Sequence, residues 1–167
     1  TGANRSTLVQ WANDQSTPHL LALHAPRISY DQQYVAYDGD VYRHITYVVD
    51  AVTGDLVLTV GDFDNKNEQF YAPCWAPDGS LVVQGGPTVN NGIYKINPEF
   101  TTITRIDPNL SNVSAPSVSP DGNKIAFVRD SELWTMGING NNPTQIITNL
   151  FQLSVPTWSP DSKYIAL

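Results

Sequence analysis

Cysteine is nearly absent from the sequence, and this absence excludes two common ways of stabilising a small domain. Cys74 is the only cysteine, so the chain cannot form an intrachain disulfide. A structural zinc site of the usual kind, with several cysteine ligands, is excluded for the same reason. The thiol lies inside a predicted strand, where we expect it to be buried and unreactive.

Basic residues and long apolar runs are also scarce in the 167-residue chain. The sequence has 9 Lys and Arg residues against 16 Asp and Glu residues, which gives a formal net charge of -7. This balance argues against nucleic acid and anionic lipid as main partners. The apolar residues, 41% of the total, occur in runs too short to span a membrane, but they suffice for one domain with a sizeable core. No signal peptide is visible, and the opening TGANRS is typical of a trimmed start.

One motif is present four times along the chain. It reads APRISYDQQYVAY from Ala25, APCWAPDGSLVV from Ala72, APSVSPDGNKIAF from Ala115 and VPTWSPDSKYIAL from Val155. The copies follow one another roughly every forty residues, and further short apolar runs lie between them. A repeat of this length with four short strands predicts the blades of a β-propeller, so we expect an all-β fold.

Each copy of the motif carries an aspartate among turn-forming residues. Pro77–Gly79 and Pro120–Gly122 both read Pro-Asp-Gly, which suits a tight turn because proline presets φ and aspartate bonds to the local backbone. Asp31 and Asp161 take the same place in the other two copies. We therefore expect turns between the first two strands of each blade rather than an acidic ring.

The remaining apolar runs complete four strands, A to D, in most repeats. Trp75 and Trp158 lie at the ends of two A strands, where we expect them to pack between blades. No segment has a convincing amphipathic helical pattern. We predict strand B at 34–37, 81–83, 124–128 and 164–167, strand C at 45–51, 92–98 and 132–138, and strand D at 55–60, 101–106 and 144–148.

The fourth repeat reaches Leu167 after strand B, and the N-terminal segment offers the two strands that it lacks. Segment 7–23 matches 132–148 in register: strand, tryptophan, polar turn, proline, strand. Pairing these strands with 155–167 would remove exposed strand edges. We therefore predict a single domain, residues 1–167, with four four-stranded blades at about 25–60, 72–106, 115–148 and 155–167 plus 7–23. The same contacts fit a closed monomer, which we favour, and a two-fold dimer that forms an eight-bladed ring.

The repeat resembles the propeller repeat of TolB-like proteins, and similar repeats occur in some bacterial peptidases. The resemblance rests on SPDGNKIAFVRDSELWTMGINGNNPTQIIT, WAPDGS and WSPDSKYIAL. It covers residues 25–167 and extends to 7–24 by register. It implies a β-propeller, and we expect a periplasmic or extracellular protein of a bacterium. TolB's role in envelope assembly does not follow, because this sequence shows four repeats rather than six and no preceding helical domain.

Ligand-binding residues are expected in the loops that join strand D to strand A and strand B to strand C. These loops, 38–44, 61–72, 84–91, 107–114 and 149–154, vary between repeats and share one face of a propeller. The loop from Gln84 has no strand–loop–helix context, so it does not indicate a phosphate site. The candidates are Tyr42, Arg43, Tyr71 and Phe151, residue types favoured at contact surfaces, together with the histidines His24 and His44.

The loop GDFDNKNEQFY, residues 61–71, departs most from the repeat. Asp62, Asp64 and Glu68 provide hard oxygen ligands at short spacing, which calcium prefers. The loop lacks the glycine and the final glutamate spacing of an EF-hand, so a solvated acidic loop is the other interpretation. We expect no cofactor, and calcium at this loop is the alternative.

Two functions remain open at this point. The first is a non-catalytic module that binds a protein, peptide or carbohydrate. The second is a metal-assisted lyase or hydrolase that uses His24, His44 and the Asp62/Asp64 loop, since some propeller lyases that resemble this repeat hold a metal with several histidines. No Gly-x-Ser-x-Gly motif or other nucleophile–base pattern is present, so we favour the binding module.

Overall fold

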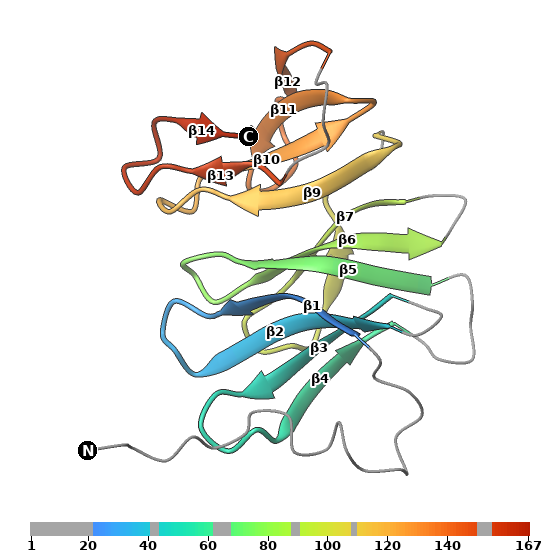
Figure 1. Cartoon of the computed structure of the whole chain (residues 1–167), viewed down its shortest axis with the longest axis vertical. Coiled ribbons are helices and arrows are strands. Elements are labelled where there is room, and N and C mark those ends of the chain that lie inside the picture. Colours follow the sequence, from blue (N-terminus) through green and yellow to red (C-terminus); the bar gives the residue numbers. More distant parts are fainter. Residues whose placement is uncertain (1–21, 41–43, 62–67, 88–90, 108–109, 150–154) are drawn as a thin grey trace.

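The computed structural model describes residues 22–40, 44–61, 68–87, 91–107, 110–149 and 155–167. Within these ranges every regular element is a β-strand (Figure 1), so the all-β prediction is confirmed. This part of the chain has no helix long and apolar enough to cross a membrane. The strands are β1 (Ala22–Ile28), β2 (Tyr34–Asp40), β3 (Ile45–Asp50), β4 (Leu56–Val60), β5 (Glu68–Trp75), β6 (Leu81–Pro87), β7 (Gly92–Ile96), β8 (Ile103–Arg105), β9 (Val113–Val118), β10 (Lys124–Arg129), β11 (Glu132–Gly137), β12 (Thr144–Ile147), β13 (Thr157–Trp158) and β14 (Ile165–Ala166).

The strands form four sheets, one for each copy of the repeat. The first sheet has the order β1-β2-β3-β4, the second β5-β6-β7-β8 and the third β9-β10-β11-β12, while the fourth contains β13 and β14. All described pairings are antiparallel and join strands that follow one another in the chain. Figure 1 shows the sheets stacked in chain order, which is the arrangement of blades in a propeller.

The start of the first sheet differs from the sequence-based boundary. Strand β1 begins at Ala22, and Ala22 and Leu23 pair with Asp40 and Gly39 of β2. We expected these two residues to end the fourth blade and the first blade to begin at about residue 25. Residues 7–21, the rest of the expected fourth-blade segment, lie outside the described residues, so the split blade stays a prediction.

An Ala-Pro pair interrupts the inner strand of each four-stranded sheet. Pairing shifts between His24 and Arg27 in β1 and between Tyr71 and Cys74 in β5. A similar shift in β9 spans the pair that begins at Ala115. Proline has no N–H to donate to a ladder and is therefore tolerated at a bulge. A bulge changes the direction of the side chains on either side of it. In β5 the bulge lies between Tyr71 on one side and the buried Trp75 on the other.

Hydrogen bonds from hydroxyl or backbone groups hold the turns between the first two strands. In the second sheet, Asp78 Oδ1 accepts a bond from the Ser80 N–H at 2.9 Å. In the other three, a serine hydroxyl donates to the carboxylate two residues later, at 2.6 Å (Ser29 to Asp31), 2.6 Å (Ser119 to Asp121) and 2.7 Å (Ser159 to Asp161). The predicted turn-forming role of the four aspartates is confirmed.

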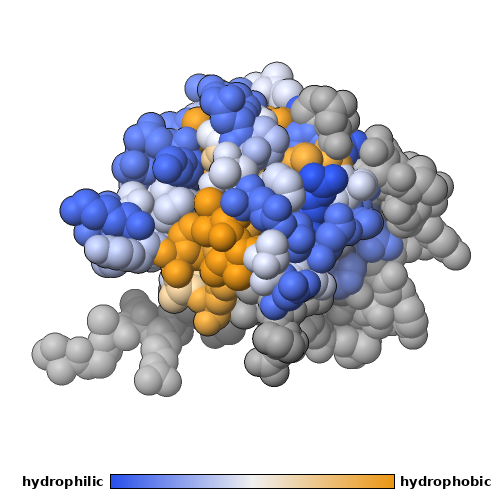
Figure 2. Space-filling model, turned by 90° about the horizontal axis from the view of Figure 1, so that it is seen from above, coloured by the Kyte–Doolittle hydropathy of each residue, from blue (hydrophilic) through white to orange (hydrophobic). Residues whose placement is uncertain are grey.

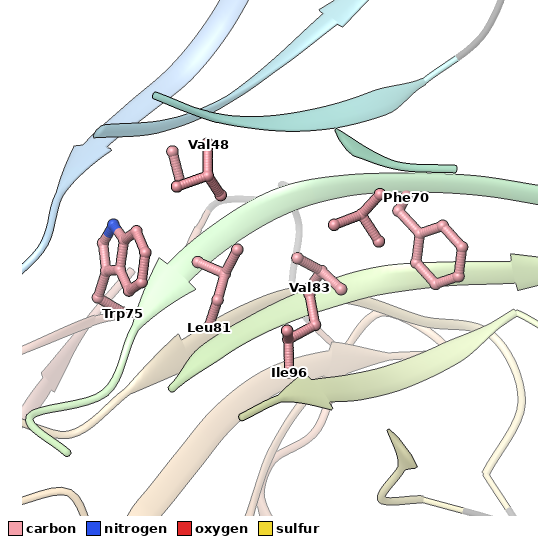
Figure 3. Close-up of a cluster of buried hydrophobic side chains, with 8 residues drawn as sticks. Val48, Phe70, Trp75, Leu81, Val83 and Ile96 are labelled. Atoms are coloured by element: carbon pink, nitrogen blue, oxygen red, sulfur yellow. The ribbon is translucent and has the colours of Figure 1, made fainter. Parts of the chain in front are cut away.

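The apolar core lies between successive sheets. Leu81 and Val83 of β6 face the first sheet, together with Trp75 (Figure 3). Val82, between them in the sequence, belongs to the cluster shared with the third sheet, which includes Phe127. This alternation follows from the two-residue period of a strand. The second sheet is therefore apolar on both faces, as a blade with two neighbours requires.

Two tryptophan side chains each donate a hydrogen bond to the backbone of the preceding sheet. Trp75 Nε1 donates to the Arg27 carbonyl oxygen at 3.0 Å, and Trp158 Nε1 donates to the Ser117 carbonyl oxygen at 2.9 Å. The predicted packing of both tryptophans between blades is confirmed. In the first sheet the same position holds Ile28, which is 57% exposed, whereas Trp75 is 5% exposed.

Candidate functional site

The structure describes two of the nine expected ligand or metal residues with their side chains. His44 immediately precedes β3, and Tyr71 lies in β5. His24 and Glu68 are placed by their backbone, in β1 and β5. The roles expected for all nine remain predictions, and five of the residues lie outside the described ranges: Tyr42, Arg43, Asp62, Asp64 and Phe151.

His44 and Tyr71 come together where the first and second sheets meet. Their ring centroids are 4.7 Å apart, and the ring planes are inclined by 42°. Two hydrogen bonds fix the backbone beneath them: the Phe70 N–H donates to the His44 carbonyl oxygen at 2.8 Å, and Thr46 Oγ1 donates to the Phe70 carbonyl oxygen at 2.9 Å. The ring pair is therefore held by two sheets at once.

Gln84 extends this junction to the third sheet. Its Nε2 donates to the Tyr71 hydroxyl at 2.8 Å and to the Val113 carbonyl oxygen at 2.9 Å. Its Oε1 accepts a bond from the Ala115 N–H at 3.0 Å. The side chain is buried, so these bonds satisfy an amide that would otherwise be costly to desolvate. One glutamine thus joins the Tyr71 phenol to the inner strand of the neighbouring blade.

Asn91 also contacts the Tyr71 hydroxyl, through Nδ2 at 3.2 Å. Among the described residues near this junction, three buried polar atoms have no hydrogen-bond partner: His44 Nδ1, Asn91 Oδ1 and Asp107 Oδ2. Buried polar atoms are normally hydrogen-bonded. Among the described residues, the junction therefore holds three buried polar atoms that lack a protein partner.

The Asp107 carboxylate hydrogen-bonds to the second sheet at the point where the chain leaves it. Its Oδ1 accepts bonds from the Ile93 N–H at 2.8 Å and from Arg105 Nε at 3.2 Å. Burial nevertheless raises the pKa of Asp107, because desolvation outweighs the opposing effects of Ile93 and Arg105. Gly92 lies against this pair, since a Cβ there would be 2.6 Å from Arg105 Nε. The Arg105–Asp107 pair can take this position only because residue 92 has no Cβ.

The described residues offer little reactive chemistry. The sequence predicts a buried Cys74, and the residue is half-buried; burial raises the pKa of its thiol to about 12, so the thiol stays protonated at neutral pH. In the described ranges no group of three or more His, Cys, Asp and Glu side chains is placed to hold a metal. Asp62 and Asp64 of the expected calcium loop are not among these residues, so that site stays a prediction.

Sequence reasoning missed Gln84 and Asn91. Gln84 follows three apolar residues in β6 and pairs with Ile93, and a polar residue in such a run is the signal that could have identified it. Its partners are backbone groups of another repeat, which no local pattern specifies. Asn91 carries no comparable signal, because asparagine is common in loops.

Similarity to known proteins agrees with the stacked sheets. Residues 88–154, less than half of the chain, match the model of the dipeptidyl peptidase IV (DPP IV) N-terminal region. The crystal structure of TolB from Acinetobacter baumannii has a TM-score of 0.69 at 22% identity, covering 87% of this chain and 37% of that one. The putative TolB from Agrobacterium tumefaciens has a TM-score of 0.65 at 20% identity, covering 81% of this chain and 53% of that one. The fold is that of a TolB-like β-propeller.

A third solved structure carries a metal on the same kind of scaffold. It is an oligogalacturonate lyase in complex with manganese, with a TM-score of 0.66 at 16% identity, covering 86% of this chain and 44% of that one. None of the curated proteins matches the sequence. This chain spans 37% to 53% of the length of the three solved structures. At these identities the similarity shows the fold, and TolB-like propellers differ in what they do.

Proposed function

We propose that the chain is a non-catalytic binding module whose ligand contacts the loop face at the His44–Tyr71 pair. The observation that carries this proposal is the pairing of the two rings at 4.7 Å on a junction of hydrogen bonds that reaches three sheets. Such a site is held rigidly by strands, so little ordering entropy is lost when a ligand binds. We place a protein, peptide or carbohydrate segment on this face.

The chemistry of the pair suits such a ligand. An imidazole and a phenol provide apolar ring surface together with hydrogen-bonding atoms, and tyrosine is among the residue types that dominate binding energy at interfaces. Asn91 lies beside the rings and donates to the Tyr71 hydroxyl at 3.2 Å. The surrounding loops are proposed to add His24, Tyr42, Arg43 and Phe151.

A metal-assisted lyase or hydrolase is the second candidate. Two observations favour it: the unpartnered Nδ1 of His44 and the manganese in the similar lyase structure. This function would use His24, His44, Asp62 and Asp64. Calcium bound by Asp62, Asp64 and Glu68 is a separate proposal for the same part of the loop face, and it requires no catalysis.

A thermal-shift panel separates these functions. Dialysed protein is heated with Mn²⁺, with Ca²⁺, and with defined sets of short peptides and of neutral and acidic oligosaccharides, alone and combined. A binding module predicts that one peptide or sugar class raises the melting temperature without metal, and that Tyr71→Phe and His44→Ala weaken the shift. Stoichiometric Mn²⁺ together with cleavage of an acidic oligosaccharide would instead establish the enzyme. A panel without any saturable shift would contradict both.

The closure and assembly of the propeller belong to the same proposal. We propose four blades, with strands from residues 7–21 completing the sheet of β13 and β14 in a closed monomer. The two-fold dimer with eight blades is the alternative assembly. We also propose a periplasmic or extracellular location in a bacterium, which the similarity to bacterial TolB structures supports.

A further inference from the structure

A groove lies between the outer strands of the first and second sheets, and its lining extends inward to Phe70, the residue before Tyr71. Its volume is about 410 Å³. Sheets twist, so blades that touch along their inner strands diverge towards their outer strands. Figure 3 shows Phe70 and Ile96, two of the lining residues, in the layer between the sheets. The full lining is Leu58, Thr59, Val60, Gly61, Phe70, Tyr94, Ile96, Phe100, Thr101, Thr102 and Ile103.

One wall of the groove is the last strand of its sheet. Strand β4 pairs with β3 on one side, and in the described sheet order it has no neighbour on the other. Its sequence, LVLTV, contains neither a charge nor a proline, and Leu56 and Val57 are 54% and 42% exposed. Edge strands are usually protected by lysine, proline or a covering segment. This uncharged edge is suited to pairing with another strand.

The pairing is regular where β4 borders the groove. Leu58, Thr59 and Val60 lie opposite Val48, Tyr47 and Thr46 without interruption, and the register shift falls before Leu58. An added strand would thus find an ordered edge at residues 58–60. Alternate side chains of that strand would enter the groove beside Leu58 and Val60, while its backbone bonds to the edge of β4.

The charges at one end of the groove indicate what the added strand carries. Asp55 directly precedes β4, and Glu99 directly precedes Phe100 in the turn from β7 to β8; both carboxylates are exposed. The nearby Lys95 is already paired with Asp78, at 3.3 Å. Within the described ranges neither carboxylate forms an ion pair, so the described charge at this end is negative, in a chain whose net charge is -7. A basic residue at the end of the added strand would complement it.

We propose that this groove binds an extended segment of a partner protein, with apolar residues at alternate positions and a basic residue at one end, which adds a strand to β4. Main-chain hydrogen bonds to the edge of β4 provide affinity, and the groove selects the apolar side chains. The added strand pairs with β4, which contributes no ring to the His44–Tyr71 contact.

The test uses a fluorescent synthetic peptide of about seven residues, the length of an ordinary strand, with valine and threonine alternating and one terminal lysine. Fluorescence anisotropy measures its binding to the full 167-residue chain. A matched peptide with alternate backbone nitrogens methylated keeps the side chains but cannot pair as a strand. We expect saturable binding of the first peptide and none of the second. Equal binding of both, or binding of neither, would overturn the proposal.

Two variants at exposed isoleucines in the outer strands of different sheets locate the binding. Ile103 of β8 lines the groove and is 46% exposed, while Ile147 of β12 is 42% exposed on the outer strand of the third sheet. We expect Ile103→Lys to weaken peptide binding by about tenfold or more and Ile147→Lys to change it by less than about twofold. Equal effects of the two variants would overturn the proposal, and circular dichroism confirms that both remain folded.

Two other occupants of the groove are outcomes of the same experiment. A mass near twice 18.4 kDa in light scattering, returning to the monomer in Ile103→Lys but not in Ile147→Lys, would mean that a second copy fills the groove. Peptide binding that requires deletion of residues 1–21 would mean that the chain's own N-terminal segment fills it. Either result would overturn the proposal of a partner protein.

Discussion

At the scale of single residues, one backbone position distinguishes the four turns between first and second strands. Gly79 and Gly122 adopt φ values of 85° and 73° in the second and third sheets. Gln32 and Ser162 occupy the same left-handed region, with φ values of 63° and 59°. A residue with a Cβ is strained there, whereas glycine is not. Two of the four turns therefore carry a local cost that the other two avoid.

Replacing Gln32 with glycine should relieve this strain. We expect Gln32→Gly to raise the free energy of unfolding by about 0.5 to 1 kcal/mol, measured by urea denaturation. Gln33→Gly is the matched control, because the neighbouring residue is also exposed but does not have a positive φ. The control should be neutral or destabilising. Equal stabilisation by both variants would show that the gain does not come from the turn geometry.

The turn aspartates should make the protein sensitive to acid. The hydroxyl bond from Ser119 lowers the pKa of Asp121 below its usual value of 3.8. The stability that this group contributes is therefore present above pH 3.8 and is lost as the pH falls through the lowered pKa. Asp31 and Asp161 behave alike, each through its serine. Urea unfolding across this range should show Asp121→Asn losing less stability in acid than the unmodified chain.

The effect of Asp107 on stability in acid should be opposite to that of the turn aspartates. Burial raises its pKa above 3.8 in the folded state, so the stability that it contributes is present below pH 3.8 and is lost as the pH rises through the raised pKa. Asp107→Asn should therefore make the loss of stability in acid steeper. A shallower acid transition in this variant would contradict the assigned direction.

At the scale of elements, the fourth sheet is attached to the third through its inner strand and through the turn that follows it. Trp158 of β13 bonds to the Ser117 carbonyl oxygen, and the Asp121 N–H donates to the Ser162 hydroxyl at 3.0 Å. Strands β13 and β14 have two residues each. So small a sheet has little ladder of its own, and its order depends on these contacts with the third sheet.

Trp158→Phe should loosen this attachment. The variant keeps most of the ring but removes the Nε1–H that donates at 2.9 Å, which should cost about 1 kcal/mol. We expect the amides of β13 and β14 to exchange with deuterium several-fold faster. Trp134→Phe is the control, since Trp134 Nε1 donates within its own sheet, to Glu132 at 3.1 Å. If Trp134→Phe also speeds amide exchange in β13 and β14, the hydrogen bond from Trp158 is not what holds the fourth sheet.

At the scale of the whole molecule, the two ends of the stack differ in what they expose. Figure 2 views the end with the third and fourth sheets and shows an apolar patch bordered by hydrophilic residues. Val155 and Leu167 are exposed in the fourth repeat, and Ile28 is exposed on the first sheet. Buried counterparts of Ile28 in the second and third sheets, Trp75 and Val118, each contact a preceding sheet. Both ends thus have surfaces of the kind that sheets bury elsewhere in the stack.

Deleting residues 1–21 tests the closure that we propose. If that segment supplies the outer strands of the fourth blade, its loss leaves the β13–β14 sheet incomplete, with an open edge. We expect a lower unfolding midpoint and association in light scattering. A truncated chain that stays monomeric and equally stable would contradict the split blade. In the full chain, a mass near twice 18.4 kDa that persists on dilution would favour the eight-bladed dimer.

Much of the scaffold could be predicted from the sequence because its determinants are local. The turn aspartates recur in all four copies, Trp75 and Trp158 hold the same place in two of them, and the structure confirms their roles. The sequence alone predicts that the first blade begins at about residue 25, whereas β1 begins at Ala22. The repeat is recognised by its Ala-Pro pair, and in β1 this pair lies at the bulge within the strand rather than at its first residue.

The candidate site was predicted only in part, because its geometry depends on contacts between repeats. His44 and Tyr71 were identified by residue type and loop position, and their ring contact was not foreseen. Gln84 reaches Val113 and Ala115 across a sheet boundary, so no spacing within one repeat encodes its role. The groove beside β4 likewise arises from the divergence of two sheets rather than from a motif.

The indole bonds between sheets have a consequence for how such a protein changes over generations. Trp75 and Trp158 each reach back to the same backbone position of the sheet before them. An in-frame duplication of the second repeat, which carries Trp75, would therefore create one new junction of the existing kind. Lineages could in this way lengthen or shorten the array by single copying errors, without first inventing a new way to join its parts.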